Sequence, residues 1–238
     1  MKASHIFPRF VPVADHALLV EFADSISDDI ANRVLALDHA ISASPPDGLC
    51  EVVPALVNLL IDFDPLVTDH SIMQSEIEAL IPRASAIDSN IQTHEVELCY
   101  DADLAPDLGA VAHAAGMSEE AVIACHLSAS YRVGMYGFAP GYAYLTGVSE
   151  QIQLPRKQVA VRDVPAGSVI IAGPQCLVTT LTMPTGWSII GRSPTEILRN
   201  DPDRPFLFDV GDTVRFKRID RNRFDALNTG NQGAISHG

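Results

Sequence analysis

The change of hydrophobic pattern near Tyr131 constrains the fold of this chain more than any other feature. Upstream of it, several segments carry apolar residues at helical spacing. From Tyr131 onward that spacing disappears, and short apolar runs alternate with glycine and proline. Frequent short strands bounded by turn residues are typical of a β-barrel or sandwich. The runs lie at 169–172, 176–181, 187–190, 206–210 and 213–216.

The first 85 residues predict a smaller domain that mixes helices with strands. Leu18, Val20 and Phe22 alternate with small or polar neighbours, as in a strand. A helix should follow from near Ser25 and end at the proline pair 45–46. The order strand, helix, strand, strand, helix suits a two-layer α+β domain of the ferredoxin-like type. The later strands are expected at 49–54 and 57–63, and the second helix at 68–80.

The remaining segments set the expected domain limits. Residues 83–93 are polar and predict a linker, which a strand at 94–100 should follow. Two short helices should come next, one closing at Gly116 and one opening at Ser118. The predicted organisation is an α+β domain at 1–85, a barrel domain at 92–225 and a tail at 226–238.

Composition excludes several classes of function. The formal net charge is −14 and the pI is about 4.8, which argues against non-specific binding to nucleic acid or to anionic membranes. No stretch is apolar enough to span a bilayer, and the N-terminus lacks the apolar run of a signal peptide. We therefore expect a cytoplasmic protein with no membrane partner. Its four well-separated cysteines should be free thiols, and no metal site is predicted.

The segment 131–145 is too rich in glycine and aromatic residues for a plain strand. Glycine lets a backbone approach a ligand closely and exposes N–H groups. The segment is either a ligand-binding loop or a barrel turn packed with aromatic rings. Its candidate binding residues are Gly137, Phe138, Pro140 and Gly141.

Four further side chains are candidates for a polar site. Arg156 and Arg162 lie close together in an acidic chain, where they could bind an anion or form a solvated rim. Gln175 follows a Gly-Pro turn and could offer both a donor and an acceptor to an amide, or could bond the local backbone. His126 ends a predicted helix, where it could serve as an acid or base or as a structural cap.

These residues belong to one ordered series of motifs. The motifs are His126, Tyr131-x-Val133, Gly137-Phe138-Ala139-Pro140-Gly141-Tyr142-x-Tyr144-Leu145, Pro155-Arg156, Arg162, Val164-Pro165-Ala166-Gly167-Ser168-Val169, Ile171-Ala172-Gly173-x-Gln175, Gly186-Trp187 and Ile190-Gly191-Arg192. With this series, most of 125–215 resembles the family of allophanate hydrolase subunit 1, the 5-oxoprolinase B-type subunit (PxpB) and KipI. Weaker matches occur at 15–22 and 53–65. After Gln175 the chain departs from the family pattern, with Cys176 in place of threonine.

The resemblance implies a cyclophilin-like barrel after the small N-terminal domain. It also implies an ATP-dependent amidohydrolase complex that opens the lactam of 5-oxoproline, with ATP bound by or with partner subunits. The partners would be a protein of the allophanate hydrolase subunit 2 type, which is the C-type component of 5-oxoprolinase, and the LamB/YcsF-type component. By the same resemblance, His126 and Gln175 would be catalytic. Substrate would be bound by Arg156, Arg162, Tyr131, Gly137, Phe138, Pro140, Gly141 and Ser168.

Two other functions stay open. The chain could be a KipI-type inhibitor that binds a histidine kinase without turnover. Prolyl isomerase activity is suggested by the barrel alone, and a fold is a poor warrant for an activity. No P-loop, nucleophile elbow or zinc-protease motif occurs in the sequence, so any ATP site would be unconventional or would lie partly on another chain.

Overall fold

The computed structural model describes residues 7–84 and 91–235, with side chains described as far as residue 228. The chain divides into two compact units, Met1–Asn90 and Ile91–Gly238. Part of the expected linker, residues 85–90, lies outside the described residues.

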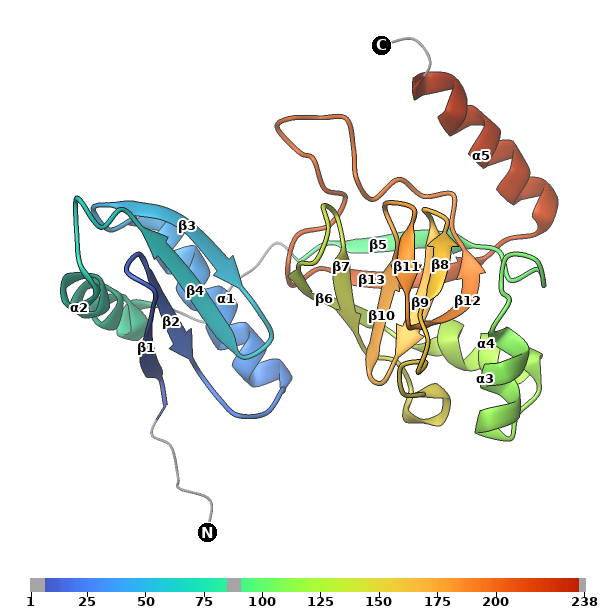
Figure 1. Ribbon diagram of the computed structural model, residues 1–238, viewed down its shortest axis with the longest axis horizontal. Coiled ribbons are helices and arrows are strands. Elements are labelled where there is room, and N and C mark those ends of the chain that lie inside the picture. Colours follow the sequence, from blue (N-terminus) through green and yellow to red (C-terminus); the bar gives the residue numbers. More distant parts are fainter. Residues whose placement is uncertain (1–6, 85–90, 236–238) are drawn as a thin grey trace. The chain divides into compact units, whose positions relative to one another are not determined.

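The N-terminal unit is a four-stranded antiparallel sheet covered by two helices (Figure 1). Its strand order is β1-β2-β4-β3, and alternate residues of β2 and β4 face the helices. Leu18 and Ile61 are fully buried there against Val34 and Ile77. The mixed α+β character is confirmed, whereas the ferredoxin-like type stays a prediction. The elements are β1 (Arg9–Val13), β2 (Ala17–Glu21), α1 (Asp28–Ala43), β3 (Leu49–Pro54), β4 (Asn58–Phe63), α2 (His70–Leu80) and the 3-10 helix η1 (Ile81–Arg83).

The start of α1 differs by a few residues from the expected position. Ser27 is the N-cap, and its hydroxyl accepts a hydrogen bond from the Ile30 amide at 3.3 Å. Ser25 lies outside the helix. Both serines stand before an acidic residue in the first turn, so sequence spacing alone could not choose between them.

The C-terminal unit is built on a seven-stranded sheet in the order β12-β9-β10-β7-β6-β13-β5. Neighbouring strands in this sheet are antiparallel, except that β13 is parallel to β5. The two edges meet where Cys99 and Arg192 exchange backbone hydrogen bonds of 2.9 Å, so the sheet is nearly closed. The strands are β5 (Thr93–Leu98), β6 (Tyr131–Tyr136), β7 (Ala143–Thr146), β9 (Ser168–Ala172), β10 (Gln175–Val178), β12 (Ser188–Arg192) and β13 (Thr213–Arg218).

Gly191 permits that closure. A Cβ atom at this position would lie 2.8 Å from Leu98 Cδ1 and 2.9 Å from the Cys99 carbonyl oxygen, closer than real Cβ contacts allow. The barrel-like sheet confirms the β-rich prediction for the second half of the chain. The cyclophilin-like type remains a prediction.

A two-stranded ribbon covers part of the outer face of this sheet. It consists of β8 (Val161–Val164) paired with β11 (Met183–Thr185). Val164 of the ribbon packs with Ile170 of β9, whereas the neighbouring Val169 and Ile171 face the barrel interior. This arrangement explains why every residue of β9 is buried: both of its faces contact apolar side chains.

Two short helices, α3 (Leu108–Ala115) and α4 (Glu119–Ser128), lie where the sequence predicts them. Gly116 ends α3 in the left-handed conformation with φ of 66°. Ser118 caps α4 by accepting a hydrogen bond from the Ala121 amide at 3.2 Å. A short 3-10 helix, η2 (Glu150–Ile152), follows β7.

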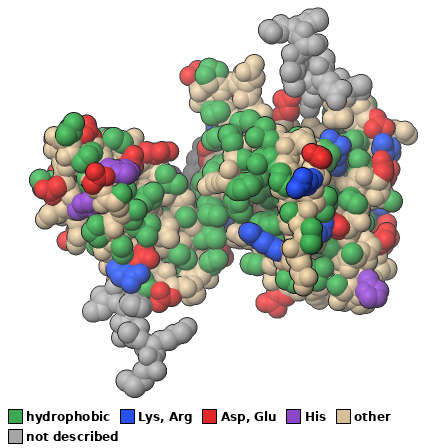
Figure 2. Space-filling model, in the orientation of Figure 1, with side chains coloured by type: hydrophobic (Ala, Val, Ile, Leu, Met, Phe, Trp, Pro, Cys, Tyr) green, Lys and Arg blue, Asp and Glu red, His purple; other side chains and the backbone are tan. Residues whose placement is uncertain are grey.

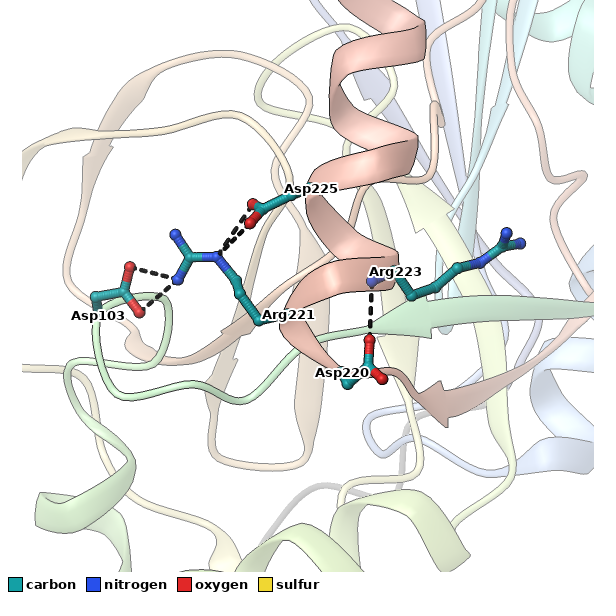
Figure 3. Close-up of polar contacts among 5 residues, drawn as sticks. All are labelled: Asp103, Asp220, Arg221, Arg223 and Asp225. Carbon is teal, nitrogen blue, oxygen red and sulfur yellow. Dashed lines mark hydrogen bonds and ion pairs between the residues drawn. The ribbon is translucent and has the colours of Figure 1, made fainter.

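The C-terminal segment corrects the prediction of a tail from residue 226. Residues 226–235 continue a helix, α5 (Arg221–Ile235). Asp220 accepts a hydrogen bond from the Arg223 amide at 2.8 Å, and Arg221 pairs with both Asp103 and Asp225 (Figure 3). Phe224 is buried beside Cys99 and Ile219. The glycines and asparagines after 227 suggested fraying, but the first turns are held by contacts that are distant in sequence.

Candidate functional site

A cavity of about 280 Å³ lies between the outer face of the barrel sheet and the β8–β11 ribbon. Ile170 and Leu177 from the sheet form apolar walls, and Tyr142, Tyr144 and Trp187 contribute aromatic ones. We call this cavity the groove. Its volume is near the lower end of ordinary ligand pockets, about 300–1,000 Å³, so it suits a small molecule. The lining residues are Phe138, Tyr142, Tyr144, Arg156, Lys157, Gln158, Ala160, Ile170, Leu177, Thr179, Met183, Pro184, Thr185, Gly186 and Trp187.

Arg156 is the groove's exposed cation. Its guanidinium carbon lies 5.5 Å from the centre of the Trp187 ring, which is a cation–π distance. Among the described residues, no carboxylate forms an ion pair with Arg156. The tryptophan holds the guanidinium at the groove while leaving its donors available for an anionic ligand.

Lys157, the second cation of the groove, is already partnered. Its ammonium group donates to Oδ2 of Asp107, which also accepts the Ile189 amide at 2.7 Å. The Lys157 amide donates to the Gly186 carbonyl at 2.6 Å. These bonds attach the segment that carries Arg156 to β12 and to the loop before α3. Lys157 therefore builds the groove wall rather than offering a free charge.

The loop at 137–142 forms one side of the groove, and most of its amides bond within the loop. Gly137, Ala139 and Tyr142 donate to carbonyls of the same loop. The backbone N–H groups of Phe138 and Gly141 are the two in this loop that have no hydrogen-bond acceptor among the described residues. Of these two residues only Phe138 lines the groove, so an oxyanion-binding role for the loop depends on the Phe138 N–H group.

The loop conformation depends on Gly141. Its φ is 74°, and an added Cβ atom would lie 2.9 Å from Thr180 Cγ2. The carbonyl of Pro140 accepts the Thr180 hydroxyl at 2.6 Å, which fixes the loop to the segment after β10. Of the predicted loop residues, Phe138 lines the groove, whereas Gly137, Pro140 and Gly141 do not.

Three other predicted residues lie near the groove without lining it. Gln175 begins β10 and shares the outer face with Leu177, but it pairs with Thr146 and Ala172 at the far end of the strand. The Ser168 hydroxyl donates to the Pro165 carbonyl at 2.7 Å, which satisfies it within a turn. Arg162 is exposed on β8 of the ribbon. The structure therefore brings Arg156 and Phe138 together, but not these three.

His126 lies inside the barrel, which corrects its predicted place in a polar site. It is 0% exposed, and its ring packs 4.7 Å from Phe216 and 5.2 Å from Tyr131, ring centre to ring centre. Its Nδ1 is hydrogen-bonded to the Tyr100 hydroxyl at 2.8 Å, and its Nε2 lies 3.7 Å from Cys176 Sγ. Burial lowers the pKa of His126 to about 3, so the imidazole is neutral near pH 7.

The sheet separates these core residues from the groove. Cys176 on β10 faces inward to His126, while the next residue, Leu177, faces outward into the groove. Tyr131, predicted to bind substrate, is also 0% exposed and donates its hydroxyl to the His126 carbonyl at 3.1 Å. Neither His126 nor Tyr131 can touch a ligand in the groove.

The sequence patterns did not predict that Trp187 supports a groove residue, and they did not predict the Asp107–Lys157 ion pair. A single tryptophan is usually a core residue, and Trp187 is indeed buried, but one face supports Arg156. Asp107 and Lys157 are 50 residues apart, and no local pattern links them. The Gly186-Trp187 motif was the available signal for the groove.

The fold and groove define a two-unit α+β protein with a nearly closed barrel-like sheet and a small ligand-sized cavity. The family model for the carboxyltransferase domain, subdomain C and D, matches residues 8–208, and the chain belongs to this family. It is 33% identical over 225 residues to the 5-oxoprolinase B-type subunit of Bacillus subtilis (strain 168), covering 90% of this chain and 94% of that protein.

Solved structures show the same fold. A crystal structure of TTHA0988 is 33% identical with a TM-score of 0.75. The match covers 86% of this chain and 40% of TTHA0988, so the chain spans about two fifths of that protein. The chain is 16% identical to the Kluyveromyces lactis urea carboxylase, with a TM-score of 0.76. The match covers 93% of this chain and 22% of the carboxylase, and it shows a likeness of fold alone.

The described residues hold neither a metal cluster nor a membrane-spanning helix. No group of three or more histidine, cysteine or acidic side chains among them is placed to bind a metal ion. No helix in the part of the chain that the structure describes has both the length and the apolar character needed to cross a membrane.

Proposed function

We propose that this chain is one component of an ATP-dependent 5-oxoprolinase complex and that its groove binds 5-oxoproline. The observation that carries the proposal is the groove itself, where the Arg156 guanidinium lies over Trp187 without a carboxylate partner among the described residues. 5-Oxoproline combines a carboxylate with a flat lactam ring. A guanidinium suits the first, and aromatic walls suit the second.

The relatives support the choice of substrate. All three curated relatives, at 28% to 33% identity, are named as the B-type subunit of 5-oxoprolinase. In the proposed reaction water adds across the lactam C–N bond and gives glutamate, with ATP hydrolysis driving the opening. This chain would hold the substrate carboxylate through Arg156. The Phe138 amide would be a donor for charge that develops on the lactam oxygen.

The proposal includes partner subunits. The described residues that line the groove include no histidine and no carboxylate, His126 is buried in the barrel, and Lys157 is paired with Asp107. Catalytic groups and ATP would then come from the subunit 2 type protein and from the LamB/YcsF-type component. Gln175 stays a proposed amide contact, dependent on how a partner extends the groove toward β10.

The test is 5-oxoproline-dependent ATP hydrolysis by the complex reconstituted from the three components of the source organism. We expect Arg156→Met to raise KM for 5-oxoproline about tenfold or more with a smaller change in kcat, because it removes a charge-assisted contact. Arg215→Met is the matched control, since Arg215 is exposed on β13 and does not line the groove. Equal KM values for the wild type and Arg156→Met would refute the assignment. A complex that forms but shows no 5-oxoproline-dependent ATP hydrolysis would refute the proposed activity.

A further inference from the structure

Three exposed apolar side chains belong to the groove or to segments directly beside its lining residues. Phe138 is 73% exposed, Val159 79% and Leu181 39%. We call these three residues the apolar rim. Phe138 lines the groove and Val159 stands between the lining residues Gln158 and Ala160. The Leu181 carbonyl accepts the hydroxyl of Tyr142, another groove residue, at 3.4 Å. Figure 2 shows hydrophobic side chains gathered on this unit, with lysine and arginine side chains beside them.

Phe138 is displayed at some cost to the fold. Its φ is 70°, a left-handed conformation that side chains other than glycine rarely adopt. The loop bonds described above hold this backbone, and the Phe138 ring lies 5.8 Å from that of Tyr142. Aromatic side chains are enriched at protein–protein interfaces, and strained backbone conformations cluster at functional sites, so Phe138 is a candidate anchor for a partner.

The charges beside the rim indicate which partner it fits. Arg156 and Arg162 have no ion-pair partner among the described residues, although the chain carries a net charge of −14. A two-fold contact between two copies of this chain through the rim would bring like charges together, which is unfavourable. A different polypeptide with carboxylates around an apolar pocket would complement both features.

The relatives supply a second, independent reason to expect another polypeptide. The curated relatives are named as subunits, and in TTHA0988 the matched part makes up only 40% of the chain. Resting on the proposed function, we infer that the apolar rim docks an acidic segment of the subunit 2 type partner. That segment covers the mouth of the groove. Docking would exclude water from a cavity that is otherwise open through its exposed lining residues.

The experiment measures the dissociation constant between the purified chain and the subunit 2 type protein of the same organism by isothermal titration calorimetry. Phe138→Gly is the main variant, because glycine accepts the positive φ and the loop should keep its conformation. We expect it to weaken binding about tenfold or more, and Val159→Ser several-fold. Leu66→Ser is the matched control: Leu66 is 94% exposed in the N-terminal unit, and its removal should change the constant less than about twofold.

Charge is tested in the same assay. Arg162→Glu should weaken binding, and raising the salt concentration should weaken wild-type binding more than that of this variant. Unchanged affinity in both Phe138→Gly and Val159→Ser would overturn the inference, and so would a wild-type chain that does not bind the partner. Self-association of the wild-type chain in sedimentation, lost in Phe138→Gly, would instead assign the rim to a second copy.

The proposed function and the docking surface can fail separately. A complex whose formation depends on the rim but that does not hydrolyse 5-oxoproline would refute the function and keep the docking surface. A complex that hydrolyses 5-oxoproline and forms equally well with both rim variants would refute the docking surface and keep the function.

Discussion

Acid sensitivity of folding is the prediction that the structure supports in most detail, and it depends on His126. Burial lowers the pKa of this imidazole from 6.5 to about 3. In the unfolded chain the same group should titrate near its ordinary value. Between the two values the unfolded state binds a proton that the folded state does not, so stability falls as pH falls below about 6.5. Above that pH the imidazole is neutral in both states and makes no pH-dependent contribution.

The size of the effect follows from the shift. Between about pH 6.5 and about pH 3, the free energy of unfolding should fall by about 1.4 kcal/mol for each unit by which the pH is lowered. The expected loss between pH 7 and pH 5 is therefore about 2 kcal/mol. Domains are typically stable by about 5–15 kcal/mol, so this loss is readily measured. The assay is urea unfolding followed by tryptophan fluorescence at several pH values, with the free energy of unfolding extrapolated to water.

The decisive comparison is with His126→Gln. Glutamine does not titrate and can still hydrogen-bond to the Tyr100 hydroxyl. Between pH 7 and pH 5, the free energy of unfolding should therefore fall by about 2 kcal/mol less in the variant than in the wild type. His113→Gln is the matched control, because His113 is exposed near the end of α3 and its removal should not change the pH dependence. If the wild type and His126→Gln show the same slope, the imidazole is not held neutral by burial. Ring nitrogen chemical shifts of His126 provide a direct check, and they should stay those of a neutral imidazole down to pH 4.

Other predictions concern α5 and the barrel seam, which is the site where the backbones of Cys99 and Arg192 join the two edges of the sheet. Gly191→Ala should destabilise the protein by about 1–3 kcal/mol in urea unfolding, because the added methyl group would meet Leu98 and the Cys99 carbonyl. Gly137→Ala is the control, because an added Cβ atom there meets nothing within 4 Å, and it should leave the free energy of unfolding almost unchanged. An equal decrease in the free energy of unfolding for both variants would contradict the close approach at the seam. Phe224→Ala should cost about 3–5 kcal/mol and expose α5 to limited proteolysis, because the ring is 3% exposed against the barrel. Arg221→Gln should change Tm only slightly, and less at high salt, because its ion pairs are solvent-exposed (Figure 3).

Residue patterns within short segments predicted much of the local structure correctly. Val34, Leu37 and Ile41 recur at helical spacing and form the buried face of α1, and Gly116 ends α3. The strand at 49–54 is β3, and β4 begins one residue after its expected start. These features depend on backbone preferences and on nearest neighbours, which a sequence states directly. The motif series around 126–192 also marked Arg156 and Phe138, which the structure brings together at the groove.

Tertiary contacts decided the rest, because inside and outside are not properties of a residue type. His126 and Arg156 both carried a polar signal, yet one is enclosed by the barrel and the other lies at the mouth of the groove. Adjacent residues of β10 face opposite sides of the sheet, so Cys176 meets a histidine 50 positions away while Leu177 lines a cavity. Only closure of the sheet and the folding of the ribbon over β9 determine which side of each strand is available to a ligand.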